Sequence, residues 1–351
     1  MPTRTVDLRI RSVKPLVAPA VLESELPLGN HGALLIARSR KEIAAILRGD
    51  DPRLVVIVGP CSIHDPAAAL DYARRLAPLA SALRDDLVVV MRVYFEKPRT
   101  VVGWKGLIND PDLDGSYAIN KGLRIARQLM LEVTAAGLPI GTEFLDTTLG
   151  QYYADLVSWG AIGARTVESQ VHRELASGLS RPVGFKNRTD GDVQVAVDAV
   201  RAARHSHGFP SLTRLGTPAI LETTGNPDTH VVLRGGTQGP NTSAESVRAV
   251  AALLRKHALP ERLMIDVSHA NSGKDPTRQP EVAAQVASQV AGGSEVIAAV
   301  MIESNLLGGS QDYQKKPLVY GRSITDACLS WGDTVPVLGL LAEAVRKRRR
   351  R

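Results

Sequence analysis

The sequence has only two cysteines, Cys61 and Cys328, among its 351 residues. A disulfide framework is not expected in an intracellular protein of this size. No apolar run approaches the roughly 20 residues that a membrane helix needs, and residues 1–11 are charged and lack the apolar centre of a signal peptide. We therefore expect a soluble, cytoplasmic protein with no membrane partner, in which each cysteine either fills the core or takes part in chemistry.

The sequence also lacks any nucleic-acid-binding motif, although its formal net charge is +7. Part of this excess lies in residues 346–351, which read RKRRRR. A nucleic-acid patch is one interpretation of that tail, and a frayed, solvated terminus is the one we favour, with no nucleic-acid partner. Other basic residues are scattered, and several follow predicted strands, which indicates small anionic ligands.

Internal repeats, low-complexity tracts and linkers are absent as well. Hydrophobic residues make up 44% of the chain, which allows a large buried core. We divide the chain into an N-terminal extension at 1–50, an oligomer or regulatory arm with a helix at 39–47, and a catalytic domain at 51–351.

Beyond the arm, short apolar runs alternate with longer segments of helical period, which is typical of βαβ units and a buried parallel sheet. The predicted strands are 54–58, 87–92, 140–144, 161–164, 183–186, 230–233, 263–267 and 296–302. The predicted helices are 66–83, 119–137, 193–203, 243–257 and 281–290. Eight strands of this kind predict an α/β protein with a (β/α)8 TIM barrel. An open doubly wound sheet is the alternative, but its Gly-rich fingerprint is missing after the first strand, where the chain reads GPCS.

Every predicted strand delivers a charged or metal-capable residue near its C-terminal end, the face on which barrel enzymes build their sites. Arg92, Arg165, Lys186 and Arg234 would form a cationic basin suited to a ligand with both phosphate and carboxylate groups. The third predicted strand contains Glu143. Any one of these residues alone could be a surface ion pair; together they indicate a site.

Cys61, His269 and Glu303 form a second set, which combines thiolate, imidazole and carboxylate. This mixture suits a divalent metal ion such as Mn, Fe, Co or Zn, and Asp326 is the natural fourth ligand. A structural metal-thiolate site is the alternative, but two carboxylates favour catalysis.

Long motifs resemble the type I (alpha) 3-deoxy-D-arabino-heptulosonate 7-phosphate (DAHP) synthases. They are GPCSIHD at 59–65, MRVYFEKPRTVVGWKGLINDP at 91–111, WGAIGART at 159–166, ESQVHRELASGLS at 168–180, PVGFKN at 182–187, LRGG at 233–236, SHANS at 268–272 and SITDAC at 323–328. The likeness spans nearly the whole chain. Departures are Val101 in place of threonine, Arg188 in place of glycine and Thr242 in place of tyrosine, with one extra residue just before Pro240.

The resemblance implies metal-dependent condensation of phosphoenolpyruvate with erythrose 4-phosphate, the entry to the shikimate pathway. The divalent-metal ligands it implies are Cys61, His269, Glu303 and Asp326. The phosphoenolpyruvate pocket it implies comprises Arg92, Lys97, Lys105, Glu143, Gly163, Ala164, Arg165, Lys186 and Arg234. The erythrose 4-phosphate loop it implies comprises Lys97, Pro98, Arg99 and Thr100. We expect Lys97 to be the catalytic acid, provided that neighbouring cations lower its pKa.

The family is typically a homotetramer with a β-hairpin insertion and feedback control by an aromatic amino acid. We therefore expect a homo-oligomer, either a dimer or a tetramer. The effector pocket that the resemblance implies comprises Phe144, Asp146, Gln151, Leu175, Leu179, Ser180, Phe209, Ser211 and Leu221, with Asp7 from a neighbouring subunit. Ser211 resembles phenylalanine-sensitive members, and ordinary packing of hairpin against barrel is the alternative for this cluster.

Three rival functions stay open at this point. An octulosonate-phosphate synthase, which takes arabinose 5-phosphate, is the nearest, but its family carries a different, Asn-containing loop where this chain has KPRT at 97–100. A basic nucleic-acid-binding protein on a barrel scaffold predicts salt-sensitive binding through residues 346–351. A metal-dependent aldolase with an unrelated substrate is the third.

Overall fold

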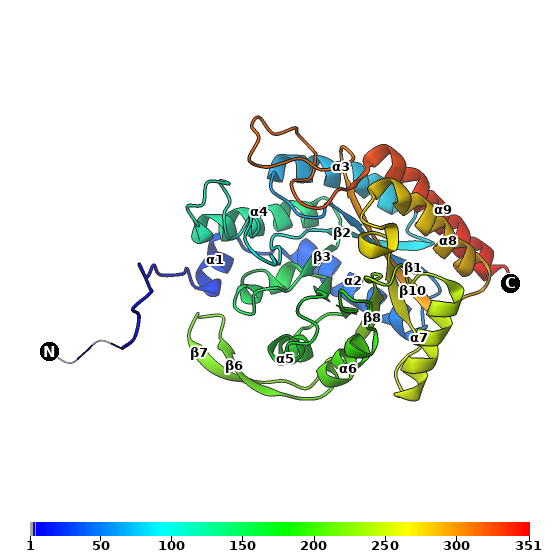
Figure 1. The fold of residues 1–351 in the computed structure, drawn as a ribbon, viewed down its shortest axis with the longest axis horizontal. Coiled ribbons are helices and arrows are strands. Elements are labelled where there is room, and N and C mark those ends of the chain that lie inside the picture. The colour runs from blue at the N-terminus through cyan, green and yellow to red at the C-terminus, as the bar shows by residue number, and fades with distance from the viewer. Residues whose placement is uncertain (1–2, 4) are drawn as a thin grey trace.

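The computed structural model describes residue 3 and residues 5–351, and its centre is a closed barrel of eight parallel strands with helices around it (Figure 1). The strand order is β1-β2-β3-β4-β5-β8-β9-β10, and β10 pairs back onto β1. This confirms the predicted (β/α)8 barrel. The strands are β1 (Leu54–Gly59), β2 (Leu87–Arg92), β3 (Ile140–Glu143), β4 (Trp159–Ile162), β5 (Val183–Lys186), β8 (Thr229–Leu233), β9 (Leu263–Asp266) and β10 (Ile297–Asn305), with a short β11 (Leu329–Ser330) beside β10.

The barrel strands are buried along their whole length, as their continuous apolar sequences predict. The outer helices are α3 (Pro66–Ala82), α4 (Ile119–Ala135), α5 (Gln170–Gly178), α6 (Gln194–Ala203), α7 (Ala244–Lys256), α8 (Gln279–Ala291) and α9 (Trp331–Arg349). Short 3₁₀ turns are η1 (Leu149–Tyr152), η2 (Ala154–Leu156), η3 (His269–Ser272) and η4 (Pro276–Arg278). In the described part of the chain, no helix is long and apolar enough to cross a membrane.

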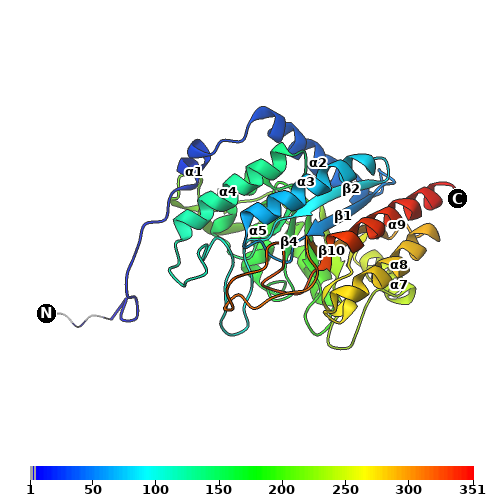
Figure 2. The same ribbon diagram turned by 90° about the horizontal axis from the view of Figure 1, so that it is seen from above.

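The N-terminal extension contributes two helices, α1 (Pro19–Glu25) and α2 (Asn30–Arg48). Ile43, Ile46 and Leu47 of α2 belong to one buried apolar cluster with strand residues such as Val55 and Val88. Figure 2 shows α2 on the side of the barrel opposite the long loops that follow the strands. Helix α2 therefore covers the N-terminal end of the barrel and leaves the C-terminal mouth open. The boundary between residues 50 and 51 stays a prediction.

A two-stranded antiparallel hairpin lies between α6 and β8, formed by β6 (Gly208–Leu212) and β7 (Pro218–Glu222). Phe209 is its buried residue, whereas Ile220 is 77% exposed. Figure 1 shows the hairpin beside α5, outside the barrel wall. The inserted hairpin is therefore confirmed.

Several predicted boundaries are wrong. The fourth strand was expected at 161–164 but begins two residues earlier, because Trp159 is fully buried and pairs with Gly141. Gly163 and Ala164 consequently lie in the loop beyond the strand. Helix α2 starts at Asn30 and not at residue 39, and sequence reasoning missed α1, α5 and α9.

The expectation of a frayed C-terminal tail is also wrong. Helix α9 continues through Arg349 and lies along α8 (Figure 2). Arg346 and Arg349 both pair with the buried carboxylate of Asp86, at 2.6 and 3.0 Å. Arg348 donates to the carbonyl oxygens of Ser294 and Pro52. These contacts tie the basic end to the barrel, because a buried carboxylate and free carbonyl oxygens need donors.

We therefore expect the double variant Arg346→Ala/Arg349→Ala to lower the free energy of unfolding by about 2 kcal/mol, since the carboxylate of Asp86 loses both charged donors. Lys347→Ala is the matched control, because Lys347 makes only an exposed pair with Glu343 in the same helix, worth about 0.5 kcal/mol. Urea unfolding monitored by circular dichroism measures both. Equal effects of the two changes would contradict this account.

Candidate active site

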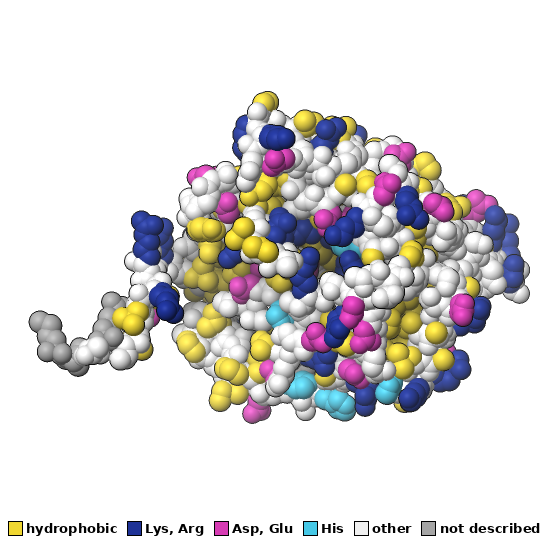
Figure 3. All heavy atoms as spheres, in the orientation of Figure 1, with side chains coloured by type: hydrophobic (Ala, Val, Ile, Leu, Met, Phe, Trp, Pro, Cys, Tyr) yellow, Lys and Arg dark blue, Asp and Glu magenta, His cyan; other side chains and the backbone are white. Residues whose placement is uncertain are grey.

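The C-terminal mouth of the barrel faces the viewer in Figure 1. Figure 3 shows Lys and Arg side chains gathered round a hollow at the centre of this face. The predicted basic residues and metal-capable residues all come from strand ends or from loops that follow them. One opening therefore collects side chains from segments that are far apart in the sequence.

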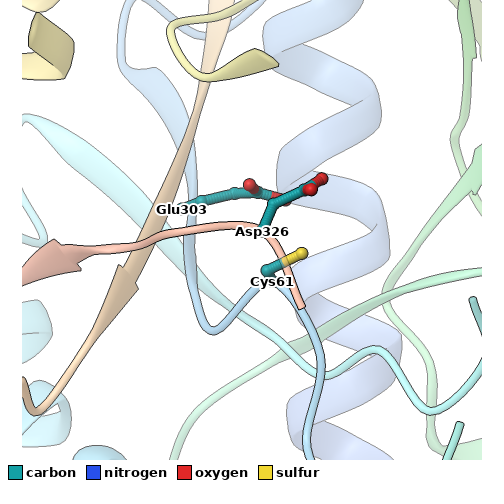
Figure 4. A group of neighbouring side chains, drawn as sticks. All are labelled: Cys61, Glu303 and Asp326. Atoms are coloured by element: carbon teal, nitrogen blue, oxygen red, sulfur yellow. The ribbon is translucent and has the colours of Figure 1, made fainter. Parts of the chain in front are cut away.

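Three of the four predicted metal ligands form a compact group. One ligand atom each from Cys61, Glu303 and Asp326 lies within 4.8 Å of the others. Figure 4 shows the three side chains converging, Cys61 after β1, Glu303 from β10 and Asp326 from the loop before β11. Cys61 and Glu303 are buried, and Asp326 is exposed. Thiolate and carboxylates at this separation can hold one divalent ion.

His269, the fourth predicted ligand, borders this group. Its Nε2 lies 3.7 Å from Oε1 of Glu303, and its Nδ1 lies 2.9 Å from the carboxylate of Asp266. The backbone at His269 is left-handed, with φ of 56°, which is uncommon for a residue with a side chain. The carboxylate of Asp266 therefore faces one ring nitrogen while the other is directed toward Glu303, an arrangement common for histidines that bind metals.

Strong electrostatic forces act on Glu303. Arg92 Nη2 donates to Glu303 Oε1 at 2.8 Å, and both side chains are almost fully buried. Burial works to raise the pKa of Glu303, but His269, Arg92 and Lys97 outweigh it and bring the pKa to about 2. Burial and the nearby Glu303 raise the pKa of the Cys61 thiol. Glu303 is therefore charged at neutral pH, and metal binding would release a proton from Cys61.

The condition that neighbouring cations lower the pKa of Lys97 is not met. Burial and Arg92 act to lower the pKa of Lys97, but Cys61 once ionised, together with Glu303 and Asp326, outweighs both and leaves the pKa above its ordinary value. Lys97 therefore carries a proton at neutral pH. Its Nζ also lies 5.8 Å from the centre of the Tyr94 ring.

The cationic basin lies around the same mouth. Lys186 is buried and its Nζ lies 2.8 Å from Asp266. Arg234 is buried, and Arg165 is exposed at the rim but close enough to act on the pKa of Arg234. Burial is the main cause of the lowered pKa of Arg234, Asp266 opposes it, and Arg165 lowers it further. One exposed cation at the rim and two buried cations behind it provide donors for an anionic ligand that reaches from the rim inward.

The remaining predicted substrate residues occupy two places. Glu143 lies so close to Gly163 that a side chain at position 163 would run into its carboxylate, and Ala164 follows directly. Lys105, Pro98, Arg99 and Thr100 belong to the loop after β2, where the Lys97 amide donates to the Lys105 carbonyl at 2.9 Å. Lys105, Arg99 and Thr100 are exposed, so this loop presents donors at the opening.

Close contacts join the end of β1 to the end of β2. Gly59 has a φ of 153°, and a Cβ there would lie 2.8 Å from the Arg92 carbonyl oxygen. This brings the end of β1 against the end of β2. Arg92 then donates to the carbonyl oxygens of Pro60 and Cys61, at 3.0 and 3.3 Å. Gly59 thus allows Arg92 to hold the segment that carries Cys61.

Sequence reasoning missed two residues of the site. Asp266 ends β9 and accepts hydrogen bonds from Lys186 and Ser268, while it faces His269. Tyr94 lies under the Arg92 guanidinium, 3.5 Å from ring centre to Cζ, and its hydroxyl is buried with no partner among the described residues. A lone carboxylate at the end of an apolar strand was the available signal for Asp266. Tyr94 had none, because a tyrosine after a strand is usually core.

The loop after Lys186 accommodates Arg188, one of the departures from the family pattern. Arg188 does not adopt a left-handed backbone, and Gly191 takes the turn with φ of 109°. The Arg188 side chain pairs with Glu168 at 2.9 Å and with Asp190. A side chain at position 188 therefore fits without strain at that residue.

Residues 30–338 match the model of the "DAHP synthetase I family". The chain belongs to that family. It is 57% identical to the Trp-sensitive phospho-2-dehydro-3-deoxyheptonate aldolase of Enterobacter agglomerans, over 98% of this chain and 99% of the relative. It is 56% identical to the Phe-sensitive protein of that name from Escherichia coli K12, over 98% of each chain. A solved structure of phospho-2-dehydro-3-deoxyheptonate aldolase from Francisella tularensis SCHU S4 superposes with a TM-score of 0.95 at 55% identity, covering 97% of this chain and 99% of that one.

This member of the DAHP synthetase I family also has a cavity of about 790 Å³ between the hairpin, α5 and α2, away from the metal-ligand residues. Six of the ten predicted effector residues line it: Gln151, Leu175, Leu179, Ser180, Phe209 and Leu221. Ser211 lines an adjoining cavity that shares Leu175 and Phe209. Gln151 also donates to the Leu212 carbonyl at 3.3 Å, which connects barrel and hairpin.

The other three predicted effector residues lie apart from the cavity walls. Phe144 is fully buried behind them, with its ring packed near Gly150. Asp146 is exposed and accepts from the amides of Thr148 and Leu149, so it caps a turn. Asp7 lies in the segment before α1, which extends away from the barrel (Figures 1 and 2).

Proposed function

We propose that this enzyme condenses phosphoenolpyruvate with erythrose 4-phosphate and water to give DAHP and inorganic phosphate, the first step of the shikimate pathway. The observation that carries this proposal is the joint placement of Cys61, Glu303 and Asp326 beside the basic residues of one barrel mouth. The names of the relatives support it, since each is a phospho-2-dehydro-3-deoxyheptonate aldolase.

The four residues Cys61, His269, Glu303 and Asp326 would hold a divalent ion. Their donor atoms suit such an ion: Cys61, Glu303 and Asp326 offer one sulfur and carboxylate oxygens within 4.8 Å of one another, and His269 Nε2 lies 3.7 Å from Glu303 Oε1. His269, Glu303 and Asp326 also line one small cavity. When bound, the ion supplies Lewis-acid polarisation of the aldehyde.

We assign phosphoenolpyruvate to the basin. Arg165 and Arg234 offer planar donors to phosphate and carboxylate, and Lys186 adds a point charge that Asp266 keeps in place. Arg92 and Lys105 complete the set, with Glu143 and the backbone of Gly163 and Ala164 on the facing side. The enol C3 would then lie toward the metal ligands.

We assign erythrose 4-phosphate to the loop 97–100 and the proton transfer to Lys97. As C3 of phosphoenolpyruvate bonds to the aldehyde carbon, the aldehyde oxygen gains negative charge and takes a proton from the Lys97 ammonium. Water adds at C2, and phosphate leaves. Lys97 carries the proton at neutral pH, and the acidic residues that raise its pKa are three of the residues assigned to the metal, whose bound charge would offset theirs.

Phosphate release tests this function. Purified enzyme incubated with phosphoenolpyruvate should release phosphate only when erythrose 4-phosphate is present, should lose the activity to a chelator, and should regain it with added divalent metal. Arabinose 5-phosphate should replace erythrose 4-phosphate poorly. Preference for the pentose would support the octulosonate-phosphate alternative instead.

We further propose that an aromatic amino acid inhibits the enzyme from the 790 Å³ cavity, with phenylalanine favoured because of Ser211. Two relatives of almost equal identity are named for tryptophan and for phenylalanine, so overall similarity does not select the effector. The apolar walls formed by Leu175, Leu179 and Phe209 suit an aromatic ring. Inhibition assays with phenylalanine, tyrosine and tryptophan decide between them, and indifference to all three would defeat the proposal.

We also propose a homo-oligomer in which Asp7 serves the effector pocket of a neighbour. The segment before α1 exposes Leu8, Ile10 and Val13, and the hairpin exposes Leu215 and Ile220. Apolar side chains concentrated on protruding segments favour an interface between copies. Light scattering after size exclusion distinguishes monomer, dimer and tetramer.

A further inference from the structure

The 790 Å³ cavity contains a buried cation that the ten predicted effector residues do not include. Arg181 lies in the short connection between α5 and β5. It lines the cavity, yet only 6% of its surface is exposed. Its Cζ lies 5.2 Å from the centre of the Phe144 ring. The guanidinium is therefore inside the wall that separates the cavity from Phe144.

Apart from its contact with the Phe144 ring, the buried Arg181 guanidinium has unused hydrogen-bond donors. Its Nε and Nη1 are buried and have no hydrogen-bond partner among the described residues. The carboxylate that acts on the pKa of Arg181 is Asp155, whose two oxygens already accept from Arg127 at 2.7 and 2.8 Å. Burial, with Arg40 adding repulsion, lowers the pKa of Arg181 to about 9. A buried charge without a partner is costly, and arginine is rarely buried in this state.

The other cations around the cavity differ from Arg181. Arg40 donates to the carbonyl oxygens of Val157 and Ala154, both at 2.9 Å. Arg48 pairs with Asp228 at 2.8 Å. Lys41 is exposed and solvated. Only Arg181, within the described part of the chain, combines burial at this cavity with unused donors.

We propose that Arg181 binds the carboxylate of the effector in the hairpin cavity. The assignment rests on the proposed regulation by an aromatic amino acid. A carboxylate offers two oxygens to the guanidinium fork and supplies the charge that its surroundings lack. The walls of Leu175, Phe209 and Leu221 then accept the ring, so the ligand class is an amphipathic carboxylate.

Isothermal titration of the full-length enzyme tests the proposal. The three aromatic amino acids and their carboxamides are titrated into the wild type, Arg181→Gln and the control Lys41→Met. Lys41→Met removes one charge from the same cavity wall without removing a buried one. We expect Arg181→Gln to weaken amino-acid binding by roughly ten- to hundredfold, the loss of one charge-assisted contact. It should leave carboxamide binding within about twofold, and Lys41→Met should change either affinity by less than about twofold.

Thermal unfolding provides a second measurement, made with and without the amino acid. Because the buried Nε and Nη1 of Arg181 have no hydrogen-bond partner among the described residues, Arg181→Gln should unfold at the same or a higher temperature than the wild type without ligand. It should lose most of the rise in melting temperature that the amino acid gives the wild type. A variant that melts clearly lower without ligand would contradict the claim that this charge is buried without compensation.

The outcomes separate the two proposals. Unchanged amino-acid affinity in Arg181→Gln, or equal loss for amino acid and carboxamide, would overturn the role of Arg181 while leaving the effector site in place. A wild-type enzyme that binds none of the three amino acids would contradict the effector proposal and the assignment of Arg181 together.

Discussion

Cys61→Ala should contain no tightly bound metal and should lose more than about a hundredfold in turnover. Cys61 provides the only sulfur in the group with Glu303 and Asp326. Even substitutions of residues that merely hold metal ligands commonly reduce affinity or activity by about 10- to 100-fold, so loss of a ligand should do more. Elemental analysis of the purified variant, together with phosphate release, measures both effects.

Cys328→Ser is the matched control for that experiment. Cys328 is also buried, and its sulfur accepts the Cys61 amide at 3.3 Å, so serine keeps an acceptor beside the same segment. We expect this variant to retain metal. Normal turnover of Cys61→Ala in the presence of chelator would remove the metal role from Cys61.

Lys97→Met should lower kcat by about 10²- to 10⁴-fold, the usual contribution of a general acid, and should weaken phosphoenolpyruvate binding much less. The physical reason is that Lys97 is placed among Cys61, Glu303 and Arg92, beside the space where the aldehyde oxygen would lie. Single-turnover kinetics separates the chemical step from binding.

Lys105→Met provides the contrast for Lys97→Met. Lys105 is exposed on the same loop and is assigned to substrate binding alone, so its loss should raise KM for phosphoenolpyruvate with a smaller change in kcat. An unchanged kcat in Lys97→Met would exclude Lys97 as the acid.

The central strands were predictable because burial on both faces leaves a clear sequence signal. The predicted strand at 87–92 and the one at 183–186 coincide with β2 and β5. The fourth strand was predicted two residues too late, because the sequence at Trp159 and Gly160 resembles a turn. Only their pairing with β3 shows that they belong to β4. Helix α9 was missed because Pro336 lies within it and its basic end resembles a solvated tail until Asp86 is seen beneath it.

The site was predictable as far as residue types at strand ends can show it. Cys61, Glu303 and Asp326 meet as expected, since closure of the barrel brings all strand ends to one face. Contacts between the side chains of different strands and loops were not predictable. The sequence does not show that Asp266 lies between Lys186 and His269, nor that the acid near Arg181 is already bound to another arginine. Such facts depend on which side chains face each other across the barrel.

The most direct test of this account is a crystal of the enzyme grown with Mn²⁺ and phosphoenolpyruvate and measured for anomalous scattering. We predict one strong peak within roughly 2.0–2.4 Å of Cys61 Sγ, His269 Nε2 and carboxylate oxygens of Glu303 and Asp326. Phosphoenolpyruvate should lie beside it on Arg165, Lys186 and Arg234. A peak remote from Cys61, in crystals that are active once dissolved, would contradict the account.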